Sequence, residues 1–135
     1  MTAWQPGMTI TAGRLMEGPD PVITTTGVVA ATGFTLSSFV GRKCGGITQV
    51  ELAITVATDI AAPSASENIG DTLACTLPEG YRPLGVVSTS WGDGSQAGEA
   101  TIGTTGLVTI RSVGYATATP AGRNIRISET FITGP

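Results

Sequence analysis

The sequence contains no histidine, and among its 135 residues Lys43 is the single lysine. Without histidine, Ser-His-Asp and Cys-His catalysis in their usual forms are excluded, and Lys43 lies in no S-x-x-K motif. A pair of carboxylates could cleave a glycosidic bond, but nothing in the sequence brings two of them face to face. The carboxylates considered are Glu51, Asp71, Asp93 and Glu99. We therefore expect no enzymatic activity and no catalytic residues.

Metal-binding residues are also scarce. The two cysteines, Cys44 and Cys75, are too few for a structural zinc site, which uses four nitrogen or sulfur ligands. Asp93 stands alone in its glycine-rich loop, whereas an EF-hand loop needs several alternating oxygen ligands. We expect no metal and no cofactor. In a chain with no visible export signal, we expect the cysteines to remain thiols rather than to form a disulfide.

Charged residues make up only 13% of the chain, well below the roughly 25% of an ordinary soluble domain. The net charge is −3 and the basic residues are scattered, so the chain lacks the basic stripe that nucleic-acid binding requires. No run of about 18 apolar residues is present, so we expect no membrane partner. A surface with so little charge favours burial between copies, and we expect a homotrimer.

From Val22 onward the sequence predicts an all-β domain, because no helical period is sustained and Val, Ile and Thr are frequent. Apolar and polar residues alternate most clearly from Ile47 to Ala57, which indicates a strand with one buried face. The other predicted strands are Gly27–Ala31, Phe34–Arg42, Thr72–Leu77, Leu84–Trp91, Glu99–Ile102, Leu107–Val113 and Asn124–Thr133. We expect a jelly-roll-like antiparallel β-sandwich over residues 22–135, in which the loop 59–70 crosses between sheets.

Residues 1–21 differ from the rest and are predicted to form a short N-terminal arm. Its helical part is limited to the stretch from Thr11 to Gly18, which is too short to be stable alone in water. Its apolar side chains therefore need a covering surface, and we expect an attachment arm. The predicted attachment residues are Trp4, Pro6, Gly7, Met8, Ile10 and Leu15.

A stiff corner is predicted between two of the strands. Pro78 suits the second position of a type I turn and Gly80 the fourth, while Pro83 forces Arg82 into an extended conformation. Tyr81, in this corner, and Trp91 could offer flat rings to a sugar, but core packing is the favoured interpretation. The corner residues are Pro78, Gly80, Tyr81, Arg82 and Pro83.

The opening W-x-P-G…I-T-A-x-R-L at residues 4–15 and the corner L-P-x-G-Y-R-P at 77–83 together resemble small virion-surface proteins of tailed bacteriophages. This resemblance implies a structural protein on the virion surface, assembled in the host cytoplasm. The first hypothesis is a trimeric capsid decoration protein, or minor capsid protein, whose arm docks on the major capsid protein.

Two alternatives to the capsid hypothesis stay open. One is a tail-associated receptor-binding knob or minor tail protein that recognises a glycan or protein of the host surface. The other is a non-viral lectin-like module. Only 21 residues precede Val22, which favours the capsid hypothesis over a receptor-binding tip with its own shaft.

Overall fold

The computed structural model describes residues 20–63, 66–114 and 117–134, and β-strands dominate them. The described residues contain no helix that is long and apolar enough to cross a membrane. The strands are β1 (Val22–Thr24), β2 (Val29–Ala30), β3 (Phe34–Cys44), β4 (Ile47–Val56), β5 (Asn68–Thr76), β6 (Val87–Gly92), β7 (Ala97–Ile102), β8 (Leu107–Ser112) and β9 (Asn124–Ile132).

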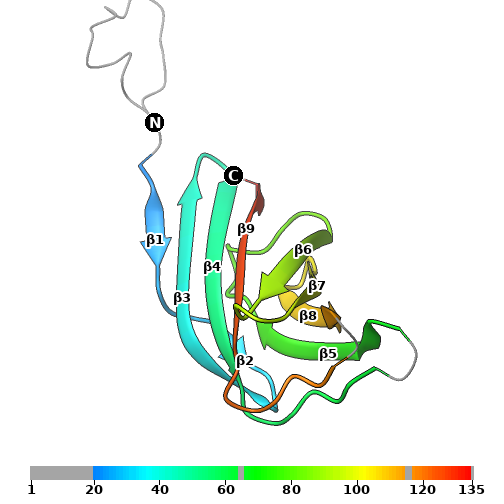
Figure 1. Ribbon diagram of the computed structural model, residues 1–135. Helices are drawn as coiled ribbons and strands as arrows, with labels where there is room; N and C mark the ends of the chain where they lie inside the picture. Colours follow the sequence, from blue (N-terminus) through cyan, green and yellow to red (C-terminus); the bar gives the residue numbers. More distant parts are fainter. Residues whose placement is uncertain (1–19, 64–65, 115–116, 135) are drawn as a thin grey trace, which may run out of the picture.

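The strands form one antiparallel sheet in the order β1-β3-β4-β9-β6-β7-β8-β5-β2. The sheet curls, so that β3, β4 and β9 form one layer, and β6, β7, β8 and β5 form the other (Figure 1). The predicted all-β, sandwich-like antiparallel fold is confirmed. The predicted crossing is present, since the chain passes from β4 in one layer to β5 in the other, but β5 begins at Asn68, so the connection ends earlier than the predicted residues 59–70.

The core lies between the two layers and follows from the alternation in β4. Every second residue of that strand, from Thr48 to Val56, is buried, while Glu51 faces outward. Burial of each such aliphatic side chain contributes about 1.5–3 kcal/mol. Trp91 fills the centre at 2% exposure and donates its indole N–H to the Ser112 carbonyl at 2.9 Å. The preference for core packing over a sugar platform at Trp91 is therefore confirmed.

The cysteines lie in different layers of the sandwich. Cys75 is buried on β5, and burial raises the pKa of its thiol to about 12. Cys44 is exposed at the end of β3, and no disulfide joins the two residues. The buried thiol therefore stays protonated and serves as a small apolar side chain of the core.

The strands differ from the sequence prediction at several places, and β5, for example, begins at Asn68 rather than at Thr72. β1 was not expected, since three residues are too few to show a period, yet Val22 to Thr24 pair with Lys43 to Gly41 at the edge of the sheet. β6 begins at Val87 rather than at Leu84. The cause is the chain path after Pro83: the Leu84 amide donates to the Ile132 carbonyl at 3.1 Å, which holds this segment against β9 before β6 begins.

The predicted corner joins β5 to β6, but its turn geometry differs from the expectation. The Tyr81 amide donates to the Pro78 carbonyl at 3.2 Å, so Pro78 is the first residue of the turn and Gly80 the third. Gly80 has φ +85°, as the third position of a type II turn requires. The type I assignment was therefore wrong. The Arg82 side chain closes the corner by donating Nε–H to the Leu77 carbonyl at 3.0 Å.

We expect Gly80→Val to lower the free energy of unfolding by about 1–3 kcal/mol, because a β-branched residue tolerates positive φ poorly. No heavy atom lies within 4 Å of an added Cβ at Gly80, so backbone strain would be the main cost. Gly85→Val is the matched control, since Gly85 has the same open space and no positive φ. Urea unfolding of both variants measures the difference. Equal effects would contradict the assignment of strain to Gly80.

Candidate functional site

The main candidate site is a hollow where the two layers of the sheet meet. Here β6 pairs with β9 through Gly92 and Arg126. Ser90 and Ser128 are the next outward-facing positions in the same register, but they do not continue the pairing and instead line a hollow of about 570 Å³. We call this hollow the seam groove. Its lining residues are Ser38, Val40, Glu51, Leu52, Ala53, Ser90, Trp91, Gly92, Ala97, Arg126, Ile127 and Ser128.

The groove combines an apolar floor with polar side chains around it. Val40, Ala53 and Ala97 supply the apolar side chains of its lining, because the core residues Leu52, Trp91 and Ile127 are only 2–4% exposed there. Serine hydroxyls stand on β3, β6 and β9. Small side chains elsewhere in the lining keep the space open. The groove can therefore accept a small ligand that has both apolar surface and hydroxyl groups, and its volume lies in the range of small-molecule sites.

The two charged residues of the groove differ in their partners. Glu51 forms an ion pair with Arg42 at 2.9 Å, which balances its charge. Arg126 forms no ion pair with any residue in the described part of the chain. Its guanidinium group is therefore available as a donor to a carbonyl, hydroxyl or anionic group of a ligand.

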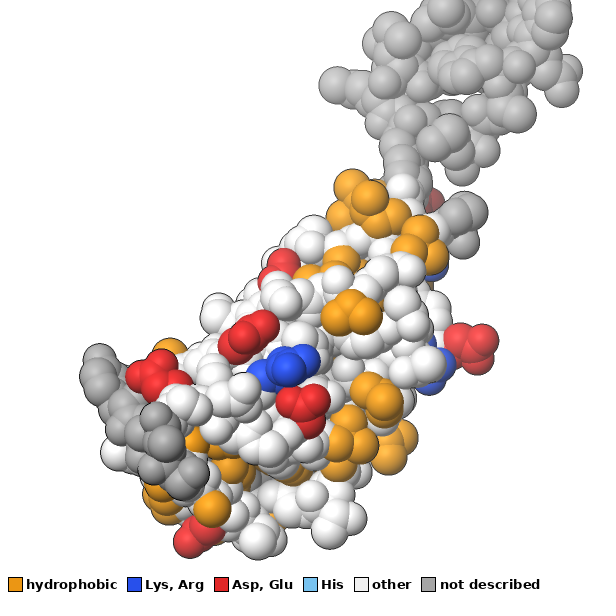
Figure 2. Space-filling view, turned by 90° about the vertical axis from the view of Figure 1, so that its right-hand side faces the viewer, with side chains coloured by type: hydrophobic (Ala, Val, Ile, Leu, Met, Phe, Trp, Pro, Cys, Tyr) orange, Lys and Arg blue, Asp and Glu red, His pale blue; other side chains and the backbone are white. Residues whose placement is uncertain are grey.

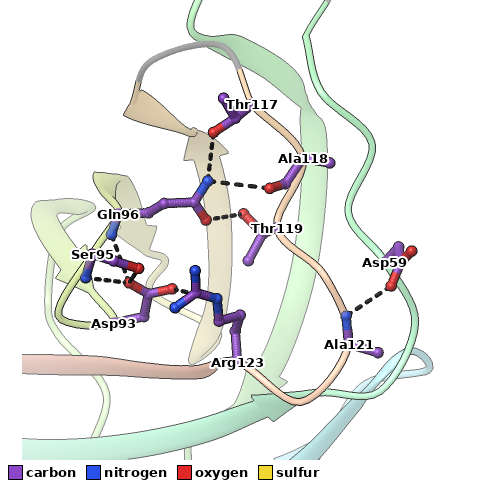
Figure 3. A network of polar contacts seen from close by, with 9 residues as sticks. All are labelled: Asp59, Asp93, Ser95, Gln96, Thr117, Ala118, Thr119, Ala121 and Arg123. Atoms are coloured by element: carbon purple, nitrogen blue, oxygen red, sulfur yellow. Dashed lines mark hydrogen bonds and ion pairs between the residues drawn. The ribbon is translucent and has the colours of Figure 1, made fainter.

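One wall of the groove ends in the β6–β7 turn, which a buried aspartate fixes (Figure 3). Oδ1 of Asp93 accepts hydrogen bonds from the amides of Ser95 at 2.7 Å and Gln96 at 2.6 Å, and from the Ser95 hydroxyl at 3.0 Å. Oδ2 makes no hydrogen bond but lies 3.5 Å from Nε of Arg123. The glycine-rich loop around Asp93 is thus the turn of the hairpin formed by β6 and β7.

Opposing effects act on the carboxyl group of Asp93, whose side chain has 0% exposure. Burial raises its pKa. The hydrogen bonds from Gln96 and Ser95 and the positive charge of Arg123 lower it by more than burial raises it, so the pKa lies below its usual value. Asp93 is therefore ionised at neutral pH and acts as a fixed acceptor within the turn.

Gln96 ties the same turn to the segment that leads into β9 (Figure 3). Its amide Nε2 donates to the Thr117 hydroxyl at 2.5 Å and the Ala118 carbonyl at 3.1 Å, and its Oε1 accepts from the Thr119 hydroxyl at 3.0 Å. Asp59 in the crossing loop accepts from the Ala121 amide at 2.7 Å. The contacts of Gln96 hold the β6–β7 turn, where this wall of the seam groove ends, against residues 117–119.

A second hollow, of about 620 Å³, lies at the end of the sandwich where the described chain begins. We call it the terminal hollow. Figure 2 shows hydrophobic side chains gathered at this end. Its lining residues are Asp20, Val22, Lys43, Gly45, Gly46, Ile47, Ile132 and Gly134.

None of the predicted site residues that the structure describes lines either hollow. The attachment residues Trp4, Pro6, Gly7, Met8, Ile10 and Leu15 are outside the described residues. Those of the corner, from Pro78 to Pro83, line neither the seam groove nor the terminal hollow. Within residues 20–63, 66–114 and 117–134 there is no group of three or more metal-ligating side chains. The groove was not predicted from the sequence as a site. The feature of the sequence that could have indicated it is the serine residues at outward-facing positions of predicted strands.

No protein-family model matches the chain, and no curated protein matches it in sequence. Among solved structures, the chain is similar to the receptor binding protein (gp15) of Listeria phage PSA, with a TM-score of 0.54 and 15% sequence identity. The similarity covers 87% of this chain and 68% of that chain. At this identity, the similarity establishes a common fold.

Proposed function

We propose that the protein is a virion protein of a tailed bacteriophage, located at the tail, where it binds the host surface without catalysing a reaction. The observation that carries this proposal is the fold similarity to a phage receptor binding protein over 87% of the chain. The sequence resemblance to small phage virion proteins agrees with it. The capsid decoration hypothesis gains no specific support from the similarity, so the tail-associated alternative is now preferred.

The seam groove is the proposed receptor contact, and a host-surface glycan is its proposed ligand. The C–H faces of a sugar can cover the apolar floor while its hydroxyls pair with Ser38, Ser90 and Ser128 around the groove. Arg126 adds a donor with no competing ion pair among the described residues. A hollow of about 570 Å³ lies within the range of small-molecule sites and can hold a few sugar units.

Filling the groove tests this function. We expect Ser128→Trp to reduce binding to bacterial cells at least tenfold, because the indole would occupy the space that the ligand needs. Thr130→Trp is the matched control, since Thr130 is exposed on the same strand and does not line the groove. Fluorescently labelled protein and flow cytometry on host cells give the measurement.

The location on the particle is tested separately by gold-labelled antibodies on intact phage. Labelling at the tail is expected. Labelling over the capsid shell, together with no binding of the purified protein to cells, would overturn the proposed function. Equal cell binding by both tryptophan variants would move the receptor contact away from the groove.

A further inference from the structure

A third hollow, of about 300 Å³, lies at the end of the sandwich opposite the terminal hollow. Strand β3 runs from one end to the other (Figure 1). Its first residue, Phe34, lines the third hollow, and Lys43, near its last residue, lines the terminal hollow. At about 3.3 Å per residue along a strand, the two positions are about 30 Å apart. We call the third hollow the distal pocket.

Hydrogen bonds between backbone groups hold the walls of the distal pocket. The Gly33 carbonyl accepts from the amides of Ala57 at 2.8 Å and Thr58 at 3.2 Å, which ties the turn before β3 to the connection from β4 to β5. Ile60 and Thr119 exchange two bonds of 2.9 Å, which tie the same connection to the segment before β9. The pocket is therefore preformed, and a preformed site loses less entropy when a ligand binds.

Threonine hydroxyls supply most of the polar groups in this lining. The Thr72 hydroxyl donates to the Gly70 carbonyl at 2.8 Å, and its oxygen can still accept from a ligand. The hydroxyls of Thr32 and Thr58 can both donate and accept. Ala61 adds a small apolar surface beside them. Such a lining fits a ligand that carries several hydroxyl groups.

Asp59 is the one charged residue among the described residues that line the distal pocket. Its Oδ1 accepts a hydrogen bond from the Ala121 amide at 2.7 Å, which fixes the carboxylate in the wall (Figure 3). Its Oδ2 has no hydrogen bond and no ion pair with any described residue. A carboxylate oxygen accepts stronger hydrogen bonds than a neutral oxygen does, so Oδ2 can hold a ligand hydroxyl.

We propose that the distal pocket is a second sugar-binding site, which takes one neutral sugar unit. Its volume lies at the lower end of the range for small-molecule sites, which suits a single unit rather than a chain. Asp59 repels anionic groups, and no described residue of the lining is basic, so the sugar carries no acidic group. The ligand class follows from this lining, while its origin on the host surface rests on the proposed function.

The distal pocket and the seam groove have no lining residue in common, so both can be occupied at once. Two sites on one chain bind a polymer of repeated sugar units more firmly than either site alone, because the second contact is intramolecular. The distal pocket therefore adds to the attachment that the groove provides.

NMR titration of the isotope-labelled full chain tests the pocket directly. The probes are glucose and galactose, each compared with its amino sugar and its uronic acid. We expect at least one neutral probe to cause saturable shifts in the backbone amides of Thr58, Asp59 and Ala61. The matching uronate should bind at least tenfold more weakly, since no described lining residue offers it a positive charge. Tighter binding of the amino sugar than of the neutral one would identify a site for cations and overturn the proposal.

Two variants and a control locate the binding. Thr58→Trp should weaken binding of the neutral probe at least tenfold, because the indole fills the pocket. Asp59→Asn should weaken it at least threefold, because an amide oxygen keeps the bond from the Ala121 amide but is a weaker acceptor than a carboxylate. Thr105→Trp, at an exposed turn position that lines none of the three hollows, should leave the affinity unchanged.

Ser128→Trp separates the distal pocket from the seam groove. This variant fills the groove alone, so the shifts at residues 58–61 should match those of the wild type. Their loss in this variant would overturn the second site, as would a titration in which no probe shifts these amides. Because the titration uses purified protein and free sugars, a failure of cell binding would contradict the proposed function without deciding the outcome at the distal pocket.

Discussion

Replacing Gly98 with alanine is expected to lower the free energy of unfolding by about 3 kcal/mol or more. Gly98 on β7 lies opposite Trp91 on β6. A Cβ added there would overlap the backbone carbonyl oxygen of Ser112 and would come within 2.6 Å of the indole nitrogen of Trp91. These are the two atoms of the buried hydrogen bond in the core. Overpacking costs about 1–3 kcal/mol, and a broken buried hydrogen bond adds about 1–3 kcal/mol.

Gly70→Ala on β5 is the control for this prediction, because an added Cβ there has no heavy atom within 4 Å. We expect it to change the unfolding free energy by less than about 0.5 kcal/mol. Urea unfolding measures both variants, and near-ultraviolet circular dichroism reports the packing of Trp91. A Gly98→Ala protein with wild-type stability and an unchanged spectrum would contradict the close packing between β7 and β8.

Asp93→Asn is expected to destabilise the protein by about 2–4 kcal/mol at pH 7. The substitution replaces a buried carboxylate that accepts three hydrogen bonds and leaves Arg123 without its ionic partner. Hydrogen bonds to a charged group contribute about 1.5–3 kcal/mol, and breaking a buried pair costs about 3–5 kcal/mol. Because Arg123 is partly exposed, we expect a value below the upper end of that range.

The same carboxylate gives stability a specific dependence on pH. The pKa of Asp93 is lower in the folded protein than its usual value of 3.8, so folding favours the ionised form. The stabilisation that ionised Asp93 gives the folded protein is fully present at pH values above the usual pKa of the group. It is lost as the pH falls through the lower pKa that Asp93 has in the folded protein. The difference in unfolding free energy between wild type and Asp93→Asn should therefore be large at pH 7 and shrink below about pH 4.

The control for the pH experiment is Asp71→Asn. Asp71 forms an exposed ion pair with Arg111 at 3.5 Å, and such pairs contribute about 0–1 kcal/mol. Urea midpoints for the two variants and the wild type at pH 7 and pH 3 test both predictions. An Asp93→Asn effect that is equal at the two pH values would show that the ionised carboxylate does not stabilise the turn.

The parts of this fold that sequence could predict are those with local signals. The alternation from Ile47 to Ala57 predicted β4, and the strands predicted at Glu99–Ile102 and Leu107–Val113 correspond to the paired strands β7 and β8. The corner was located correctly between β5 and β6. Its turn type was not, because proline and glycine two residues apart fit either of two turn registers, and only the hydrogen bond from Tyr81 distinguishes them.

The seam groove could not be predicted, because the pattern of residues within one strand does not show which strands become its neighbours in the sheet. Ser38, Glu51, Ser90 and Ser128 come from β3, β4, β6 and β9, and they share one hollow only because β9 inserts between β4 and β6. The same holds for Asp93 and Arg123, which are 30 positions apart in the numbering. The predicted attachment arm involves residues outside the described ones, so it stays a prediction.

The position of β9 has a consequence for synthesis of the chain on the ribosome. This strand is translated after every other described strand, yet it pairs with β4 along its whole length and joins the two layers. Until residues 124–132 emerge, the facing edges of β4 and β6 have no partner, and exposed strand edges of this kind pair with other chains. The nascent polypeptide therefore completes its core in one late, long-range step, which is slow and prone to aggregation. A translational pause or release before residue 124 would yield aggregated protein rather than a partly folded monomer.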